Sequence, residues 1–176
     1  EKTKIAESLI QDMNILFNNS NSGLAISVVV VGALMAASTG IVGASVVTLG
    51  LLTYPVLIKN GYSPSVATGT ICASGTLGQI IPPSLVLILL ADVLSSSYQQ
   101  AQLNMGIFNP ESITIADLFV GAILPGLILP IFYIIYLKSL KIKTVNKELS
   151  NKKTNILSVI YPLSLMLVVL GSIIFG

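Results

Sequence analysis

Two long stretches without a charged side chain constrain this chain more than any other feature. No Asp, Glu, Lys or Arg occurs between Asp12 and Lys59, or between Lys59 and Asp92. Charged residues make up 9% of the 176 residues and hydrophobic residues 53%. Soluble domains carry about 25% charged residues, spread over their surface. The sequence therefore predicts an all-α, multi-pass membrane protein.

The first charge-free stretch is too long for one helical crossing. A helix over residues 23–58 would be about 54 Å long, against a hydrocarbon core of about 30 Å. Small and hydroxyl-bearing residues gather near its middle, in AASTGIVGAS (residues 36–45). This pattern predicts a re-entrant helical hairpin over 23–59 that turns near the middle of the membrane. Small-residue packing within one tilted span is the alternative.

The second charge-free stretch carries an interruption of its own. A half helix with Pro64 in its first turn is expected to precede SGTLGQIIPPS (residues 74–84), and a second half helix follows Ser84. The two prolines of this sequence remove two amide donors, and its glycines weaken a helix further. Residues 60–94 are therefore predicted to form a discontinuous transmembrane helix.

The remaining segments are assigned from polarity and charge. Residues 1–22 predict an amphipathic arm helix and a linker, and residues 95–114 a lysine-free external loop. A transmembrane helix over 115–137 is expected to start where Thr114 and Asp117 can cap it. Residues 138–154, with six of the nine lysines, predict a basic cytoplasmic loop before a last transmembrane helix over 155–176.

The lysines argue for the hairpin independently. If the N-terminal lysines Lys2 and Lys4 lie inside and residues 23–58 cross the membrane once, Lys59 and the six-lysine loop lie outside and the lysine-free loop inside, which inverts the positive-inside rule. If the segment enters and returns, all of these lysines share the cytoplasmic side. The hairpin is therefore the simpler interpretation.

The residues that the chain lacks exclude several classes of protein. It has no His, Arg or Trp, and its one cysteine is Cys72, so a disulfide within the chain, His/Cys metal sites and Ser-His-Asp chemistry are excluded. Cys72 is expected to be a small buried hydrophobe. The lysines lie beside apolar segments and form no nucleic-acid face. The chain begins at Glu1 without a signal peptide and is expected to be a piece of a longer protein.

Two interruptions in successive membrane segments predict a binding site. Irregular backbone at membrane depth persists only where protein or a water-filled cavity surrounds it, and in secondary transporters substrate and coupling ions bind there. The hydroxyls of Ser38, Thr39 and Ser45 are expected to face the break at 74–84. Asp92 and Asp117 lie near span ends, which favours Na⁺ held by neutral oxygens over proton coupling. A channel and an intramembrane enzyme are the alternatives from other classes.

A family resemblance is carried by the same residues. The tip ASTGIVGAS, the entry GYSP, the break ATGT and ASGTLGQIIPPS, and the later ADLFVGAILPG occur in this order. In this the chain resembles the large membrane subunit of tripartite ATP-independent periplasmic (TRAP) transporters. A divalent-anion/sodium symporter of similar hairpin architecture, which works without a binding protein, is the second candidate.

The resemblance implies more than the residues alone predict. It implies an elevator-type, sodium-driven importer of carboxylates in the bacterial inner membrane, with a small membrane subunit and a periplasmic substrate-binding protein as partners. This chain would hold one inverted repeat plus the start of the next. The implied Na⁺ ligands, many of them through backbone carbonyls, are Ser38, Thr39, Gly75, Gly78, Ile81 and Pro83. The candidate substrate-binding residues are Gln79, Ser84 and Ser45, with packing or helix capping as the alternative role of the first two.

Overall fold

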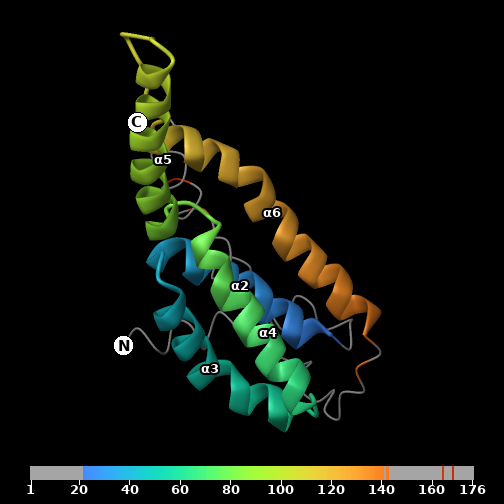
Figure 1. Cartoon of the computed structure of the whole chain (residues 1–176). Helices are drawn as coiled ribbons and strands as arrows, with labels where there is room; N and C mark the ends of the chain where they lie inside the picture. The colour runs from blue at the N-terminus through green and yellow to red at the C-terminus, as the bar shows by residue number, and fades with distance from the viewer. Residues whose placement is uncertain (1–21, 141, 143–163, 165–167, 169–176) are drawn as a thin grey trace.

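The structure is a computed structural model that describes residues 22–140, 142, 164 and 168. The predicted arm helix, most of the basic loop and all but two residues of the predicted last span lie outside these residues. In the described part all regular structure is helical, without a strand (Figure 1). Its elements are α2 (Gly23–Thr39), α3 (Val42–Lys59), α4 (Pro64–Thr76), the 3₁₀ helix η1 (Leu77–Gln79), α5 (Leu85–Asn104) and α6 (Ile115–Ser139).

Helix α2 is the centre of the bundle and packs against α3, α4 and α6. Its side chains from Leu24 to Val29 are buried on every side of the helix, as expected of a helix that is apolar all round. Gly32 lets α4 approach closely, because a Cβ added there would lie 2.5 Å from the Cβ of Ser74. The absence of a side chain at this position therefore sets the spacing of the two helices.

Several buried hydroxyls in the bundle form hydrogen bonds within their own helices. Ser27 Oγ donates to the Gly23 carbonyl at 2.9 Å, Thr53 Oγ1 to Leu49 at 2.7 Å, and Ser74 Oγ to Thr70 at 2.6 Å. Such bonds to the carbonyl four residues earlier let a polar residue enter an apolar core. Among the described residues, every buried side-chain nitrogen or oxygen atom has a hydrogen-bond partner.

The turn between α2 and α3 is tighter than the sequence predicted. The interruption expected over residues 36–45 shrinks to Gly40 and Ile41, because α2 continues through Thr39 and α3 begins at Val42. Gly40 has a φ of 62°, in the left-handed region that glycine adopts without strain. One glycine is thus sufficient to reverse the chain.

A glycine cap joins α3 to α4. Gly61 has a φ of 86°, its N–H donates to the Ile58 carbonyl at 3.0 Å, and the Tyr62 N–H donates to Leu57 at 3.1 Å. These two bonds are those of a Schellman motif. Ser63 then caps the N-terminus of α4, whose first residue is Pro64. The predicted position of Pro64 in the first turn is confirmed.

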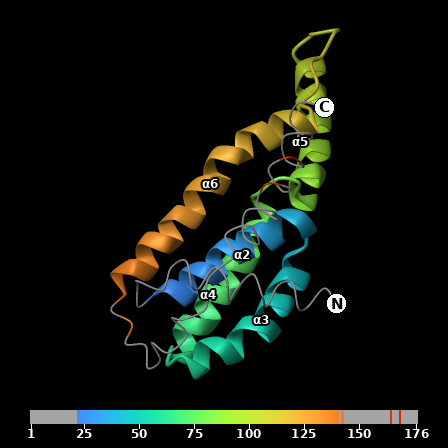
Figure 2. The same ribbon diagram turned by 180° about the vertical axis from the view of Figure 1, so that it is seen from behind.

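The start of α2 and the ends of α3 and α6 lie together. Ser22 Oγ donates to the Leu137 carbonyl at 2.6 Å, and the Ala25 N–H donates to the Tyr62 hydroxyl at 3.4 Å. Lys59 and Lys138 occupy the last turns of α3 and α6, so both lysines lie at this end. Figures 1 and 2 show the α5–α6 connection at the opposite end.

Helix α5 extends farther than predicted. It continues to Asn104, so the first ten residues of the predicted 95–114 loop are helical. Gln and Ala are good helix formers, and no glycine or proline occurs before Gly106 to end the helix. The capping box at α6 is confirmed: Asp117 accepts from the N–H and the hydroxyl of Thr114, whose Oγ1 accepts from the Asp117 N–H at 3.2 Å.

The prediction that Cys72 is buried was wrong. Helix α4 buries the face that carries Ala67, Ile71 and Ser74 against its neighbours, and Cys72 is exposed on another face. Burial depends on which face has a neighbour, which an apolar run does not reveal. Of the described helices, α3 and α6 are long and apolar enough to cross a membrane.

The arrangement of the ends predicts the result of side-specific labelling. In the full-length protein with Cys72→Ser, single cysteines at the exposed positions Lys59 and Lys138 should react with an impermeant thiol reagent from one side of the membrane. A cysteine at Asn104 should react only from the other side. Labelling of positions 59 and 138 from opposite sides would contradict the arrangement.

Candidate functional site: the junction of two helix breaks

The turn of the α2–α3 hairpin lies directly against the break between α4 and α5. A Cβ added at Gly40 would lie 3.0 Å from the Pro83 carbonyl oxygen and 3.6 Å from the Leu85 nitrogen. The two interruptions, about 40 residues apart in sequence, are therefore in contact. The expectation that the tip faces the break agrees with this geometry.

A second close contact fixes the same junction. A Cβ added at Gly75, in the last turn of α4, would lie 3.0 Å from the backbone nitrogen and Cα of Val46. Val46 belongs to the start of α3, so α4 ends against the beginning of α3. The junction thus gathers four helix ends: the C-termini of α2 and of α4 with η1, and the N-termini of α3 and α5 (Figure 1).

Hydroxyl groups line the hairpin side of the junction. Thr39 Oγ1 lies 2.7 Å from Ser45 Oγ, and Ser45 Oγ also donates to the Ile41 carbonyl at 3.0 Å. Thr39 is exposed, whereas Ser45 is 1% exposed. Ser38 lies in the last turn of α2, and its side chain is outside the described residues. Two of the three predicted tip hydroxyls are therefore adjacent.

The predicted site residues of the break differ from one another in exposure and in hydrogen bonding. Ser84 is fully buried and caps α5: its Oγ donates to the Gln79 carbonyl at 2.7 Å and accepts from the Leu87 N–H at 3.4 Å. Gln79 itself is exposed in η1, and Gly78 beside it is buried. The structure shows a capping role for Ser84, and contact with substrate stays a prediction for Ser84, Gln79 and Ser45.

Ile81 and Pro83 lie on different sides of the break. The carbonyl group of Pro83 faces Gly40. Ile81 instead packs toward α6, because a Cβ added at Gly126 of that helix would lie 3.4 Å from Cγ1 of Ile81. Sequence reasoning singled out neither Gly40 nor Gly126 as a site residue. A lone small residue in an apolar helix such as ILPGLIL signals a close approach, but its neighbour is visible only in the folded chain.

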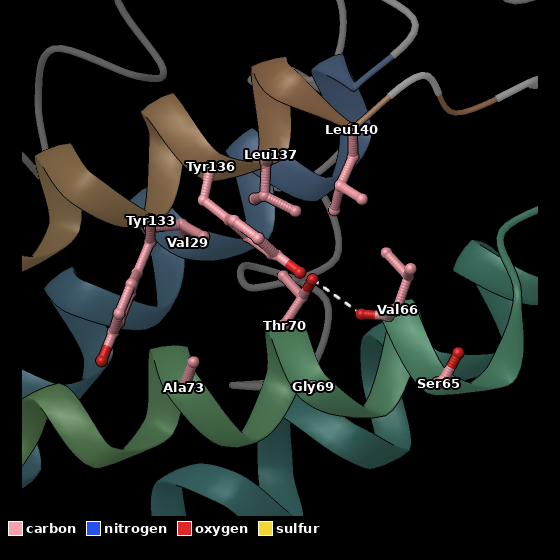
Figure 3. Close-up of a pocket in the computed structure, with 10 residues that line it drawn as sticks. All are labelled: Val29, Ser65, Val66, Gly69, Thr70, Ala73, Tyr133, Tyr136, Leu137 and Leu140. Carbon is pink, nitrogen blue, oxygen red and sulfur yellow. Dashed lines mark hydrogen bonds between the residues drawn. The ribbon is translucent and has the colours of Figure 1, made fainter.

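A separate cavity of about 440 Å³ lies between α2, α4 and α6. From α6, the rings of Tyr133 and Tyr136 point toward α4, whose Thr70 hydroxyl donates to the Val66 carbonyl at 2.8 Å (Figure 3). No charged side chain is among its lining residues, which are Val29, Ser65, Val66, Gly69, Thr70, Ala73, Tyr133, Tyr136, Leu137 and Leu140. The cavity shares no predicted site residue with the junction.

Comparison with known families agrees with the junction motifs. The model of the family described as "Tripartite ATP-independent periplasmic transporter, DctM component" matches residues 1–176. This chain belongs to the DctM family. The family description names a transporter component, and the curated relatives are named as permease proteins and not as enzymes.

Curated relatives carry the same family name. The chain is similar to the C4-dicarboxylate TRAP transporter large permease protein DctM of Vibrio cholerae, with 34% identity over 127 residues, 72% of this chain and 24% of the relative. The DctM protein of Rhodobacter capsulatus is 29% identical over 130 residues, 71% of this chain and 28% of the relative. The ectoine TRAP transporter large permease protein TeaC of Halomonas elongata is 28% identical over 131 residues, which are 74% of this chain and 27% of the relative.

The matched region spans about a quarter of the length of these relatives. No solved structure matches the chain.

The contact at Gly40 predicts the effect of adding one methyl group. Gly40→Ala in the full-length DctM protein should lower its thermal unfolding midpoint, because a left-handed alanine costs about 1–2 kcal/mol and its methyl meets the Pro83 carbonyl. The matched control is Gly43→Ala, since a Cβ added there meets nothing within 4 Å. Equal midpoints for the two variants would contradict the contact between tip and break.

Proposed function

We propose that this DctM chain is part of the large permease subunit of a sodium-coupled, binding-protein-dependent secondary transporter. The transporter imports organic acids such as C4-dicarboxylates, sialic acid or related carboxylates across the bacterial inner membrane. Its partners are a small membrane subunit and a periplasmic substrate-binding protein. The observation that carries the proposal is the contact between the hairpin turn and the helix break at Gly40 and Pro83.

The depth of the junction supports a re-entrant hairpin. Helix α4 has 13 residues and rises about 20 Å from the end that carries Lys59, less than the hydrocarbon thickness of about 30 Å. Because the turn at Gly40 contacts the break beyond α4, both share this depth. The hairpin then returns to the lysine end without crossing, and the lysine-rich side is the cytoplasmic side.

The four helix ends give the junction opposite partial charges. The N-termini of α3 and α5 carry partial positive charge, which favours a carboxylate, while the C-termini of α2 and α4 present carbonyl oxygens, which favour a cation. The cap residue of α3, Ile41, has no side chain that can accept from the first amides of that helix. These amides suit a substrate carboxylate.

The oxygen atoms at the junction suit Na⁺ as the coupling ion. We assign its ligands to hydroxyl or carbonyl oxygens of Ser38, Thr39, Gly75, Gly78, Ile81 and Pro83, with Gln79, Ser84 and Ser45 toward the substrate. All of these oxygen ligands are uncharged. Of the described carboxylates in the helices, Asp117 is engaged in the capping box of α6 and Asp92 lies beside Ser112–Ile115, away from the junction.

Substrate choice among relatives varies, since the named relatives transport C4-dicarboxylates or ectoine. The family match favours the binding-protein-dependent transporter over the divalent-anion/sodium symporter that the hairpin pattern also permits. In the elevator mechanism, which is part of this proposal, the junction would move with its bound ions as one body.

Uptake into proteoliposomes tests the proposed function. The full-length permease, reconstituted with its small subunit and binding protein, should take up labelled C4-dicarboxylate saturably when an inward Na⁺ gradient is imposed. Omission of the binding protein should abolish uptake. Equal uptake with K⁺ in place of Na⁺ would refute sodium coupling, and a large single-channel current would indicate a channel instead.

Replacement of one hydroxyl tests the ion site. Thr39→Val keeps the shape of the side chain and removes an oxygen, so the half-saturating Na⁺ concentration for uptake should rise about fivefold to tenfold if that oxygen is a ligand. Thr48→Val makes the same change at an exposed position of α3 and should leave the Na⁺ titration unchanged. If Thr39→Val and Thr48→Val changed the half-saturating Na⁺ concentration equally and only slightly, Thr39 would be a packing residue and not a ligand.

A further inference from the structure

A further pocket, of about 490 Å³, lies between α5 and the start of α6. Asp92 and Ser95 line it from α5, and Ser112 and Thr114 line it from the segment that leads into α6. The pocket shares no residue with the junction or with the cavity between α2, α4 and α6. None of the described residues that line it is basic. Its carboxylate therefore has no cationic neighbour in the pocket.

The carboxylate of Asp92 also lacks a partner elsewhere in the described part of the chain. It has neither an ion pair nor a hydrogen bond there. Between Lys59 and Lys138 the sequence contains no lysine or arginine, and both of these lysines lie at the other end of the bundle. A carboxylate on an apolar helix of a membrane protein marks a functional site and requires a cationic or hydrogen-bonding partner.

The pocket lies at the boundary of the hydrocarbon region. Helix α6 has 25 residues and is about 37 Å long, so it can cross a hydrocarbon core of about 30 Å, with Lys138 in its last turn. Its first residue, Ile115, lines the pocket near the opposite boundary. Figures 1 and 2 show the start of α6 beside α5 at the end of the bundle away from the lysines. Asp92 is therefore placed where lipid headgroups lie.

The lining changes from apolar to polar along α5. Ile88 and Leu89 precede Asp92 by about one turn, on the side of the helix break and the middle of the membrane, and Leu89 is 69% exposed. Ser95 follows Asp92 by about one turn, away from the middle of the membrane. A phospholipid has the same order, because its acyl chains fill the hydrocarbon core and its polar headgroup lies at the surface. The pocket therefore matches the polarity of a lipid molecule.

Two hydroxyl groups beside Asp92 can contact a headgroup. Ser95 Oγ accepts from Gln99 Nε2 at 3.3 Å, which leaves its own proton for an external acceptor. Ser112 Oγ has no hydrogen bond within the described residues. The hydroxyl of Thr114, by contrast, is engaged in the capping box of α6. A carboxylate that accepts and hydroxyls that donate suit a headgroup that carries both an ammonium and a phosphate group.

We infer that this pocket binds the headgroup of phosphatidylethanolamine. The primary ammonium of this lipid donates to the Asp92 carboxylate, its phosphate oxygens accept from the hydroxyls of Ser95 and Ser112, and an acyl chain lies along Ile88 and Leu89. The inference depends on insertion of the protein in a membrane and not on sodium coupling or on the identity of the transported substrate.

The chemistry of this end of the bundle selects among phospholipids. A choline headgroup has no N–H donor, so it cannot form the charge-assisted hydrogen bond to the carboxylate. Headgroups of net negative charge are disfavoured, because residues 60–137 carry three acids and no base. A zwitterionic headgroup with N–H donors meets both requirements.

The first test compares lipids that differ only in the number of N–H donors. Native mass spectrometry of the full-length permease should give a dissociation constant for phosphatidylethanolamine about tenfold below that for phosphatidylcholine with the same acyl chains, as expected for one hydrogen bond to a charged group. The N-methylated intermediates should lie between the two. Equal dissociation constants across this series would overturn the inference without the use of any variant.

Substitutions locate the lipid at this pocket. Asp92→Asn keeps the shape of the side chain and removes its charge, so the dissociation constant for phosphatidylethanolamine should rise about tenfold while that for phosphatidylcholine stays unchanged. Asp92→Glu keeps the carboxylate and should restore most of the preference. Glu111→Gln, the matched control, removes an acid in the same region outside the pocket and should resemble the unmodified protein.

Thermal unfolding in nanodiscs distinguishes a lipid from a protein partner of Asp92. The unmodified permease should unfold at a higher temperature in phosphatidylethanolamine than in phosphatidylcholine, and Asp92→Asn should remove this difference. If Asp92→Asn lowers the midpoint equally in both lipids, a basic residue of another protein segment pairs with Asp92 and the inference is wrong. Retention of the full lipid preference in Asp92→Asn also overturns it.

Discussion

The structure depends on how backbone polar groups are paired where helices stop inside an apolar environment. An amide or carbonyl without a partner costs several kcal/mol in hydrocarbon, so a helix break there requires cover. In this chain each of the two breaks covers the other: Gly40 lies against Pro83, and Gly75 lies against Val46. Both contacts use glycine because a side chain would separate the segments. The central position of α2, which joins these contacts to α6, follows from the same requirement.

The contacts also explain why this part of a DctM protein forms one compact bundle. Helices α2, α3 and α4 share a continuous core that includes Leu49, Leu57 and Ile71. Helix α5, by contrast, packs mainly on α6 and η1 within the described residues, and apolar residues such as Leu89 and Val93 remain exposed. Exposed apolar side chains of this kind leave these surfaces open to contact with lipid or with other protein.

Local signals in the sequence predicted where two helices begin. Pro64 lies in the first turn of α4, and Thr114 with Asp117 caps the start of α6, both as expected. The end of α5 was not predicted as well, since it lies ten residues beyond position 94. The exposure of Cys72 was mispredicted because it depends on which helix faces which neighbour.

Some features of the candidate site could likewise be predicted from the sequence, whereas others depended on the fold. That the tip would meet the break followed from two interruptions that both need cover. The choice between substrate contact and helix capping was left open for Ser84, and the packing of Ile81 toward Gly126 was not predicted, because both depend on the path of η1 and on the position of α6. Residue type predicted the kind of atom at the junction, and only the fold shows which atoms are already engaged.

The hydrogen bond between Ser22 and Leu137 bears on the order in which the protein is made. It joins residues 115 positions apart, at the start of α2 and near the end of α6. A chain leaves the ribosome from its N-terminus, so α2, α3 and α4 are complete well before α6 exists. Until then the start of α2 lacks this partner and one of its covering helices. Closure of the bundle is therefore a late step of biogenesis, because α2, α3 and α4 are made before the helix that completes it.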